Sequence, residues 1–297
     1  MNSQTILITG ASGFIGKALV ASLSNCPDLK IYSTGKTSFP DLANYIEADL
    51  IKGNFIETIK KNLQKCDVIV HLAACIDKNS DSKKILDVNC YGTSQIVDLA
   101  RELNCKKIIY FSSSGVIGKP FEIPITEFHP VKPLNNYHCS KAFGELIINQ
   151  SKQYDICPVI YRIPSPIGKN MPLNKILPVF INNCIENKNI FLYGKGLRKQ
   201  NYIDIQDIIE AVKLAIYKNI KGVFNIASNK SYSNIELAEI CIKLLNSSSK
   251  IIFNNIPDPE EDFNWTFSID KAKSILEFCP KINIETSILD IKNRLEK

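Results

Sequence analysis

The first half of the chain alternates short apolar stretches with amphipathic ones, and this alternation limits the folds open to it. Strands and helices that follow one another in turn place successive strands parallel in one sheet. Right-handed crossovers then put helices on both of its faces. The sequence therefore predicts an α/β fold with a doubly wound parallel sheet, the Rossmann fold. Strands are expected at 6–9, 30–33, 68–72, 107–111 and 159–162, and helices at about 15–23, 55–63, 91–103 and 137–152.

The pattern changes near residue 164, within the proline-rich stretch RIPSPIGKNMPLNKILP. Prolines at this density predict loops rather than another strand–helix unit. Farther on, Ser233 to Glu236 reads SNIE, a capping box that predicts the start of a further helix. We expect a Rossmann domain over 1–164 and a smaller C-terminal substrate-binding portion over 165–297. Residues at about 204–227 are expected to return to the Rossmann core.

Composition excludes several classes of protein. A net charge of +6 over 297 residues, with scattered lysines, does not form the basic patch of a nucleic-acid-binding protein. The apolar runs are too short for a membrane span, and the N-terminal QTILITG lacks the features of a signal peptide. Ten cysteines without a C-x-x-C pair indicate neither a metal site nor a disulfide framework. We therefore expect a cytoplasmic protein with reduced thiols and no nucleic-acid or membrane partner.

A glycine-rich turn, TGASGFIG, follows the first predicted strand and contains Gly10, Gly13 and Gly16. Between a strand and a helix, glycines at this spacing allow a tight turn, close approach of the backbone to a pyrophosphate, and close packing of the helix on the sheet. The N-terminus of the next helix offers free N–H groups and a positive dipole end to the phosphates. The turn therefore predicts a dinucleotide site, with Phe14 and Ile15 in its first helical turn.

The end of the second predicted strand bears on which dinucleotide binds. An acidic residue there would bind the adenosine ribose hydroxyls of NAD. The sequence instead runs from Tyr32 to Lys36 as YSTGK, which has no acid and ends in a cation. A missing carboxylate removes repulsion against a 2′-phosphate, and Lys36 is able to pair with one. The pattern leans to NADP and leaves NAD open.

Tyr137 and Lys141 stand four residues apart near the start of the helix predicted in NNYHCSKAFGELI. On a helix this spacing puts both side chains on one face, one turn apart. By itself the pair also suits a solvated surface, so its role depends on the rest of the chain. The residues spaced to cover one apolar face of the same helix are Ala142, Phe143, Leu146 and Ile147.

Eight motifs, taken in order, resemble those of the extended short-chain dehydrogenase/reductases, specifically the branch of NAD(P)-dependent nucleotide-sugar epimerases and dehydratases. They extend over nearly the whole chain: TGASGFIG (9–16), ADL (48–50), HLAA (71–74), VNCYGT (88–93), FSSSGVIG (111–118), YHCSK (137–141), RIPSPIG (162–168) and GKGLRKQNYIDIQD (194–207). The resemblance implies an enzyme that moves a hydride between NAD or NADP and a nucleotide-activated sugar.

Carried over residue by residue, the resemblance implies the catalytic set Ser113, Tyr137 and Lys141. Ser114 is the alternative to Ser113, because the register is counted back from Gly118. Tyr137 would be the acid/base. Its pKa would be brought down from about 10 by Lys141, by the positive nicotinamide and by partial desolvation of the pocket. Ser113 would hydrogen-bond the substrate oxygen.

The same resemblance implies a set of cofactor-binding residues. Asp49 and Leu50 would lie at the adenine, and Asn89 would belong to the motif that braces the active-site helix. The other residues implied for this site are Leu72, Ala73 and Ala74 along the pyrophosphate and ribose, together with Ser112, Tyr137, Lys141 and Ile163.

One departure from the family pattern narrows the reaction. Related 4,6-dehydratases carry an Asp-Glu pair directly after the catalytic Thr, where this chain has Ser114 and Gly115. Dehydration is therefore not expected, which leaves a 4-epimerase or a 4-ketoreductase. A protein of another class is also open, one that binds a dinucleotide as a structural or redox-sensing ligand without turnover.

The substrate side departs from the pattern as well. Ser165 stands where related epimerases place an Asn, and Gln200 replaces the usual phosphate-binding Arg. We expect these two residues and Ser114 to contact the substrate. Three cations lie nearby in the sequence, and they either supply the lost charge or form a solvated loop: Lys195, Arg198 and Lys199.

As in relatives, the helices near 91–103 and 137–152 are expected to pair with their copies in a homodimer.

Overall fold

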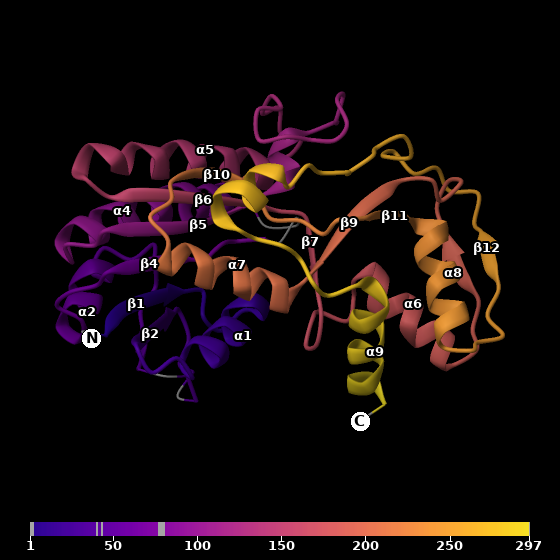
Figure 1. The fold of residues 1–297 in the computed structure, drawn as a ribbon, viewed down its shortest axis with the longest axis horizontal. Coiled ribbons are helices and arrows are strands. Elements are labelled where there is room, and N and C mark those ends of the chain that lie inside the picture. Colours follow the sequence, from indigo (N-terminus) through magenta and orange to yellow (C-terminus); the bar gives the residue numbers. More distant parts are fainter. Residues whose placement is uncertain (1–2, 40, 43, 77–80, 297) are drawn as a thin grey trace.

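A seven-stranded parallel sheet forms the centre of the larger part of the molecule (Figure 1). The computed structural model describes residues 3–39, 41–42, 44–76 and 81–296. The strands lie in the order β10-β6-β5-β4-β1-β2-β3, and every neighbouring pair is parallel. Their bounds are β1 (Gln4–Thr9), β2 (Leu29–Gly35), β3 (Tyr45–Glu47), β4 (Val68–His71), β5 (Lys107–Ser113), β6 (Cys157–Ile163) and β10 (Gly222–Asn225).

Alternate residues of the central strands are buried on opposite faces of this sheet. In β1, Ile6 and Ile8 belong to one apolar cluster and Leu7 to another. In β5, Phe111 belongs to the cluster of Ile6 and Ile8, and Tyr110 belongs to the cluster of Leu7. A parallel sheet covered on both faces requires such continuous apolar strands. The expected doubly wound sheet is therefore confirmed.

Helices cover the two faces of the sheet. One face carries α1 (Phe14–Leu23) and α7 (Ile205–Tyr217), whose buried residues share the cluster of Ile6 and Ile8. The other face carries α2 (Phe55–Asn62), α4 (Gly92–Glu102) and α5 (Asn136–Gln150). Two short helices precede α4, namely α3 (Ser82–Leu86) and the π-helix η1 (Asp87–Tyr91). The 3₁₀-helices η2 (Ser114–Ile117) and η3 (Ser151–Tyr154) follow β5 and α5.

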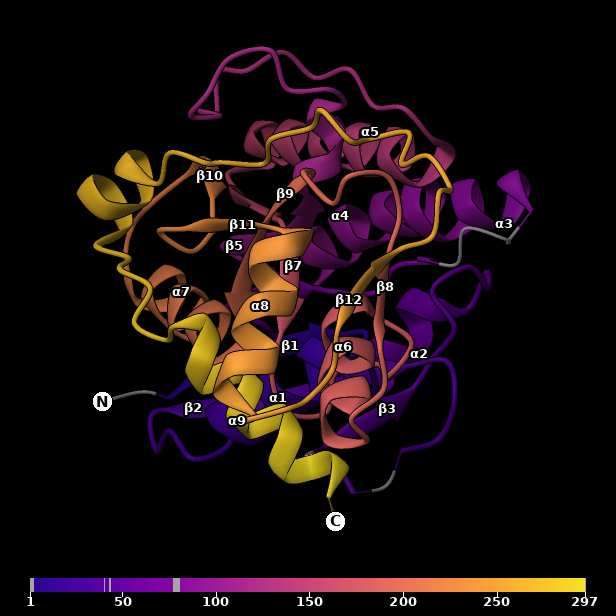
Figure 2. The same ribbon diagram turned by 90° about the vertical axis from the view of Figure 1, so that its right-hand side faces the viewer.

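The smaller part of the molecule has its own sheets (Figure 2). It also has its own apolar cluster. A three-stranded sheet has the order β11-β9-β7, and a two-stranded sheet pairs β12 with β8. The strands are β7 (Ser165–Ile167), β8 (Ile190–Leu192), β9 (Lys199–Asp204), β11 (Ser231–Ser233) and β12 (Ile251–Phe253). The helices are α6 (Ile176–Ile185), α8 (Asn234–Leu244) and α9 (Ile284–Leu295), with the π-helix η4 (Ala272–Leu276) between α8 and α9.

The two parts are joined by several crossings of the chain. From the later half, β10 pairs with β6 and α7 packs on α1, so both elements lie in the larger part. After β12 the chain runs back to the larger part (Figure 1). There the Ile125 N–H donates to Thr266 O at 2.8 Å. The capping box is present at α8, because the Ser233 and Glu236 side chains each accept the other residue's backbone N–H. Across the described residues, no helix is long and apolar enough to cross a membrane.

Several elements were not expected from the sequence. The strands β3, β7, β11 and β12 are each three residues long, too short to produce a detectable apolar period. The strand β9 reads KQNYID, where polar residues interrupt the apolar ones. The strand expected at 107–111 extends two residues farther and includes Ser112 and Ser113.

Candidate active site

The glycine turn lies between β1 and α1, against the residues that follow β4. Gly10 has φ +66°, and a Cβ there would lie 2.7 Å from Ala73 N. A Cβ on Gly16 would lie 2.3 Å from Gly10 O, so neither position tolerates a side chain. Gly13 is exposed at the N-cap of α1, next to Phe14 and Ile15. The turn therefore presents bare backbone and the N-terminus of a ten-residue helix, which fits a pyrophosphate.

The other candidate cofactor residues lie at the carboxyl ends of strands of the same sheet. Leu72, Ala73 and Ala74 come directly after β4 and are half-buried. Ile163 ends β6 and is 5% exposed. Lys36 is exposed, one residue beyond β2. In parallel sheets a ligand binds at this carboxyl edge, so the positions suit a dinucleotide laid across the strands.

Asp49 and Leu50 differ in their surroundings. Asp49 is half-buried, and its carboxylate accepts the Ile51 N–H at 3.3 Å. Leu50 is 8% exposed and packs against α4, where a Cβ on Gly92 would lie 2.7 Å from Leu50 Cδ2. Leu50 is therefore mainly a core residue, which limits what it can offer an adenine.

The three serines at the end of β5 have different environments. The Ser112 hydroxyl donates to Glu145 Oε1 at 2.6 Å, so its side chain points at α5. Ser113 is half-buried, and its Oγ accepts the Gly115 N–H at 3.2 Å. Ser114 is buried at the start of η2. Since Ser113 is more accessible than Ser114, it remains the better candidate for contact with a substrate.

Tyr137 and Lys141 lie one turn apart on α5, as their spacing predicts. Lys141 is only 2% exposed, and its Nζ lies over the Tyr110 ring, 4.1 Å from the centroid. The Tyr110 hydroxyl donates to the backbone oxygen of Lys141 at 3.4 Å. The lysine is therefore held against β5 by a cation–π contact rather than extended into solvent.

Burial has opposite effects on the two groups. It raises the pKa of Tyr137 to about 12, because desolvation disfavours the phenolate. It lowers the pKa of Lys141 to about 7, and nearby Glu145 opposes this by favouring the ammonium. The expectation that desolvation helps Tyr137 to ionise is therefore wrong in sign. A nearby positive charge or hydrogen bonds donated to the phenolate would lower the pKa of Tyr137. The pKa of Lys141 lies near neutral pH, so this residue can exchange a proton there.

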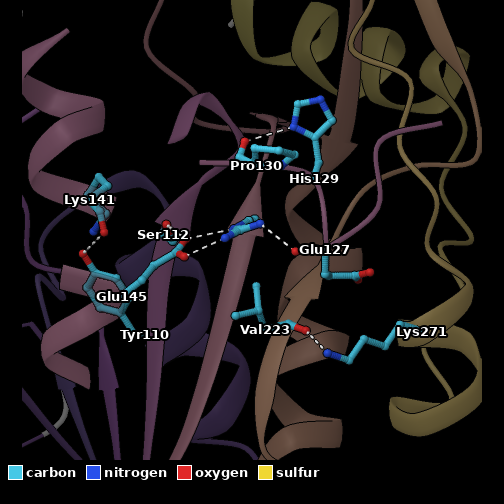
Figure 3. A network of polar contacts seen from close by, with 10 residues as sticks. Tyr110, Ser112, Glu127, His129, Pro130, Lys141, Glu145, Val223 and Lys271 are labelled. Carbon is cyan, nitrogen blue, oxygen red and sulfur yellow. Dashed lines mark hydrogen bonds and ion pairs between the residues drawn. The ribbon is translucent and has the colours of Figure 1, made fainter. Parts of the chain in front are cut away.

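A buried ion pair fixes α5 on the sheet (Figure 3). Arg162 of β6 donates to Glu145 through Nε at 3.0 Å and through Nη2 at 2.8 Å. Arg162 Nη1 also donates to Glu127 O at 3.2 Å. With the bond from Ser112, the Glu145 carboxylate accepts three hydrogen bonds. Two strands thereby hold the helix one turn beyond Lys141.

A second polar network begins at the glycine turn and passes through His71. The Thr93 hydroxyl donates to Asn89 O at 2.6 Å, so Thr93 Oγ1 must accept its bond of 3.2 Å from His71 Nε2–H. His71 Nδ1 is then an acceptor, and it receives the Thr9 hydroxyl at 2.7 Å. Thr9 Oγ1 in turn accepts the Ala73 N–H at 3.2 Å. Burial lowers the pKa of His71 to about 3, so the ring stays neutral.

Asn89 continues this network to α5, the helix that carries Tyr137. It lies in η1 and is 1% exposed. Its side chain accepts the Cys75 N–H at 2.7 Å and donates to Cys75 O and to Ser140 Oγ. The Ser140 hydroxyl donates to Tyr137 O at 2.7 Å. Hydrogen bonds therefore connect the glycine turn to the backbone of Tyr137.

Glu145, Arg162 and His71 were not among the site residues predicted from the sequence. A signal was present for two of them, because Arg162 and His71 stand at the ends of the apolar runs VIYR and VIVH. A charged or polar side chain in a strand that is buried on both faces needs a partner. Their partners come from helices distant in sequence, so only the fold identifies them.

The candidate substrate residues lie on the three-stranded sheet of the smaller part. Ser165 of β7 is opposite Tyr202 of β9, two residues from Gln200. The structure therefore brings Ser165 and Gln200 to adjacent strands. Lys195 and Lys199 are exposed.

Arg198 is already engaged by carboxylates. It pairs with Glu260 at 3.0 Å and with Asp258 at 3.5 Å. The Glu261 carboxylate accepts the backbone N–H groups of Lys195 at 2.6 Å and of Leu197 at 2.7 Å. To bind a phosphate, Arg198 would have to leave two carboxylates.

Comparison with known proteins gives consistent matches over the length of the chain. The model of the NAD dependent epimerase/dehydratase family matches residues 6–227. A putative UDP-glucose 4-epimerase from Methanocaldococcus jannaschii is 30% identical, with 97% of each protein covered. The dTDP-D-glucose 4,6-dehydratase of Mus musculus is 27% identical, over 96% of this chain and 87% of that protein. The solved UDP-glucuronic acid 4-epimerase from Bacillus cereus, in complex with UDP-glucuronic acid and NAD, superposes with a TM-score of 0.87 at 22% identity and covers 99% of both chains.

Proposed function

Because the chain belongs to the NAD-dependent epimerase/dehydratase family, we propose that it acts on a nucleotide-activated sugar as a 4-epimerase or a 4-ketoreductase. The observation that supports this proposal is that Ser113 ends β5 at the carboxyl edge of the sheet, while Tyr137 and Lys141 lie one turn apart on α5, where Lys141 packs on Tyr110 of β5. A dinucleotide bound at that turn would exchange a hydride with the sugar carbon. All three residue types needed to handle the accompanying proton are present.

The proposed roles follow from the chemistry of each side chain. Ser113 hydrogen-bonds the oxygen on the reacting carbon and holds it near Tyr137. The Tyr137 phenolate takes the hydroxyl proton when the carbon is oxidised and returns it on reduction. Lys141 stabilises the phenolate while it bears its ammonium charge. Because its own pKa of about 7 lies close to neutral pH, Lys141 can also give a proton to Tyr137 after Tyr137 has passed its proton to the substrate.

The choice against dehydration rests on two positions. Ser114 and Gly115 offer no carboxylate to remove a carbon-bound proton or to protonate a leaving hydroxyl. Dehydratases are nevertheless among the relatives, so the reaction must be identified from its products.

We also propose a cytoplasmic location, because the ten cysteines are free thiols. For the cofactor we propose NAD or NADP, with Lys36 favouring NADP.

We propose a homodimer formed through α4 and α5. The single apolar face expected on α5 is wrong in part, because Phe143 is 52% exposed and Leu146 63% exposed. Ala142 and Ile147 pack on the core instead. Tyr91, beside the start of α4, is 49% exposed. A second copy would remove these side chains from water.

The test combines a product assay with one substitution. The purified protein is incubated with NAD or NADPH and with UDP-glucose, UDP-glucuronic acid or dTDP-glucose, and products are identified by NMR. We expect a change of configuration or oxidation state at carbon 4. Tyr137→Phe should lower kcat by about 10²- to 10⁴-fold with cofactor affinity retained, because only the proton carrier is lost. Unchanged turnover in this variant would remove the assignment. Cofactor binding without turnover of any sugar would favour the non-catalytic alternative.

A further inference from the structure

Two residues of β5 each contact a residue of α5. The Lys141 Nζ lies 4.1 Å from the centre of the Tyr110 ring. Ser112, which lies two residues after Tyr110 and therefore on the same face of the sheet, donates to Glu145 Oε1 at 2.6 Å. Lys141 and Glu145 are four residues apart, so they also share one face of the helix. The ammonium and the carboxylate therefore belong to the same layer between α5 and β5.

This layer is closed to water. Lys141 is 2% exposed and Glu145 is 7% exposed. The helix approaches the strand closely at Gly144, where a Cβ would lie 2.1 Å from the Tyr110 hydroxyl oxygen. Because charges interact more strongly where water is excluded, the state of Glu145 has a large effect on Lys141.

Glu145 supplies the negative charge that faces Lys141. The titratable groups around Lys141 in the described part of the chain come from four elements: Tyr110 of β5, Tyr137 and Glu145 of α5, Cys90 of η1 and His71 of β4. Burial lowers the pKa of Lys141, and Glu145 opposes this more strongly than Cys90 does. Burial keeps the imidazole neutral and both phenols protonated at neutral pH, since it lowers the pKa of His71 and raises that of each tyrosine.

Arg162 limits what Glu145 can do for Lys141. It lies opposite Ser112 where β6 pairs with β5. Its Nε and Nη2 donate to the two oxygens of the Glu145 carboxylate at 3.0 and 2.8 Å. A carboxylate that is already paired with a guanidinium attracts a second cation less strongly than a free one. Glu145 therefore divides its charge between Arg162 and Lys141.

We propose that Glu145 and Arg162 together set the protonation state of Lys141, with Glu145 favouring the ammonium and Arg162 opposing it. Both are positioning residues, because they act through Lys141. The effect on the reaction rests on the proposed function, in which the Lys141 ammonium favours the Tyr137 phenolate. The effect on Lys141 itself is independent of any substrate. The pair thereby selects the pH range in which the reaction runs.

Replacing one partner at a time should move the pKa of Lys141 in opposite directions. Glu145→Gln keeps the shape of the side chain and removes its charge, so this pKa should fall by about one pH unit or more. Arg162→Met leaves the Glu145 charge to Lys141, so the same pKa should rise by a similar amount. The measurement is an NMR titration of protein labelled with ¹³C at lysine Cε, in which the Lys141 signal is identified by its loss in Lys141→Met. Glu102→Gln removes an exposed carboxylate and is the control, which should leave the pKa unchanged.

A second variant covers the case in which Arg162→Met does not fold. Arg162→Met combined with Glu145→Leu removes both charges, so its Lys141 pKa should lie above that of Glu145→Gln, where the guanidinium stays without its partner. A pair that only holds the helix in place would change Tm without opposite shifts. Shifts of the same sign in the two single variants, no shift in Glu145→Gln, or a double variant no higher than Glu145→Gln would overturn the proposal.

The kinetic measurement tests the link to the reaction. With a sugar that the wild type accepts, the pH dependence of kcat should move to lower pH in Glu145→Gln and to higher pH in Arg162→Met, because the phenolate needs the ammonium. Opposite NMR shifts with an unmoved pH profile would overturn the role in the reaction. If the wild type turns over no sugar, the proposed function fails, and the NMR titration still decides whether the pair controls Lys141.

Discussion

Glu145 and Arg162 share two hydrogen bonds inside the interface between α5 and the sheet, and their side chains are 9% and 5% exposed. Glu145 lies one turn beyond Lys141 on the helix that carries Tyr137, and Arg162 lies on β6. A buried pair of opposite charges is costly to break from one side, because the remaining charge then has no partner. The position of α5 therefore depends on both residues together.

Removing one partner should destabilise the protein more than removing both. We expect Arg162→Met to lower the free energy of unfolding by about 3–5 kcal/mol, since it leaves the Glu145 carboxylate buried without a cation. Arg162→Met with Glu145→Leu should recover much of this loss. Urea unfolding followed by circular dichroism measures both. The exposed pair Lys60 and Glu102 is the control, and Glu102→Ala should have little effect. Equal losses in the single and double variants would contradict the argument.

Lys141 should give the stability a particular pH dependence. Its pKa is about 7 in the folded protein and about 10.4 in an unfolded chain. Between these values the unfolded chain binds more protons, so stability rises as the pH increases from about 7 to 10. Below pH 7 the protein bears the full cost of the buried ammonium. Lys141→Met should therefore be more stable than the wild type at pH 6, and this advantage should shrink toward pH 10.

The same variant should lose activity at every pH, because Tyr137 loses the cation that favours its phenolate. Chemical unfolding at pH 6, 8 and 10, together with kcat, tests both effects. Lys152→Met is the control, because Lys152 is exposed. A constant difference in stability across this range would show that Lys141 is not buried as an ammonium.

His71 should contribute to acid unfolding. Its pKa is about 3 in the folded protein and about 6.5 in an unfolded chain. Because the unfolded chain binds the proton first, stability falls as the pH drops from about 6.5 toward 3. We expect His71→Gln to flatten this part of the stability curve and to weaken NAD binding, since the bond from Thr9 beside the glycine turn depends on Nδ1. Urea midpoints between pH 3.5 and 7 measure the slope. An unchanged slope would argue against a neutral buried ring.

Lys36 is expected to discriminate between the two dinucleotides. It is exposed one residue after β2, at the sheet edge where the adenosine ribose would lie. Lys36→Ala should weaken NADPH binding by about tenfold and leave NADH binding nearly unchanged, because only the former has a 2′-phosphate to pair with. Fluorescence titration gives both Kd values. Equal effects on the two cofactors would remove the argument for NADP.

The exposed face of α5 should control assembly. Leu146→Glu introduces a charge at a position 63% exposed in the single chain. If two copies meet there, the charge should shift the protein from dimer to monomer in analytical ultracentrifugation. Lys152→Glu, on the exposed turn after α5, is the control and should not change the mass. A wild type that is monomeric would contradict the proposed homodimer.

The sequence by itself determined the doubly wound sheet and the place of the glycine turn. Both depend on short-range information: apolar strands such as TILIT and VIVH must be covered on two faces, and the glycines sit between a strand and a helix adjacent in the chain. The spacing of Tyr137 and Lys141 also follows from one helical turn. Such features need no knowledge of which segments meet.

Only the tertiary structure decided what surrounds these residues. The partners of Glu145, His71 and Arg198 come from segments far away in the chain. Burial then reversed the expected effect of desolvation on Tyr137, since a pKa depends on the whole environment of a group. The ring of His138 over Gly115 is a contact of the same kind. These contacts join residues that are far apart in the chain and leave no periodic pattern in the sequence. They can therefore be identified only from the folded structure.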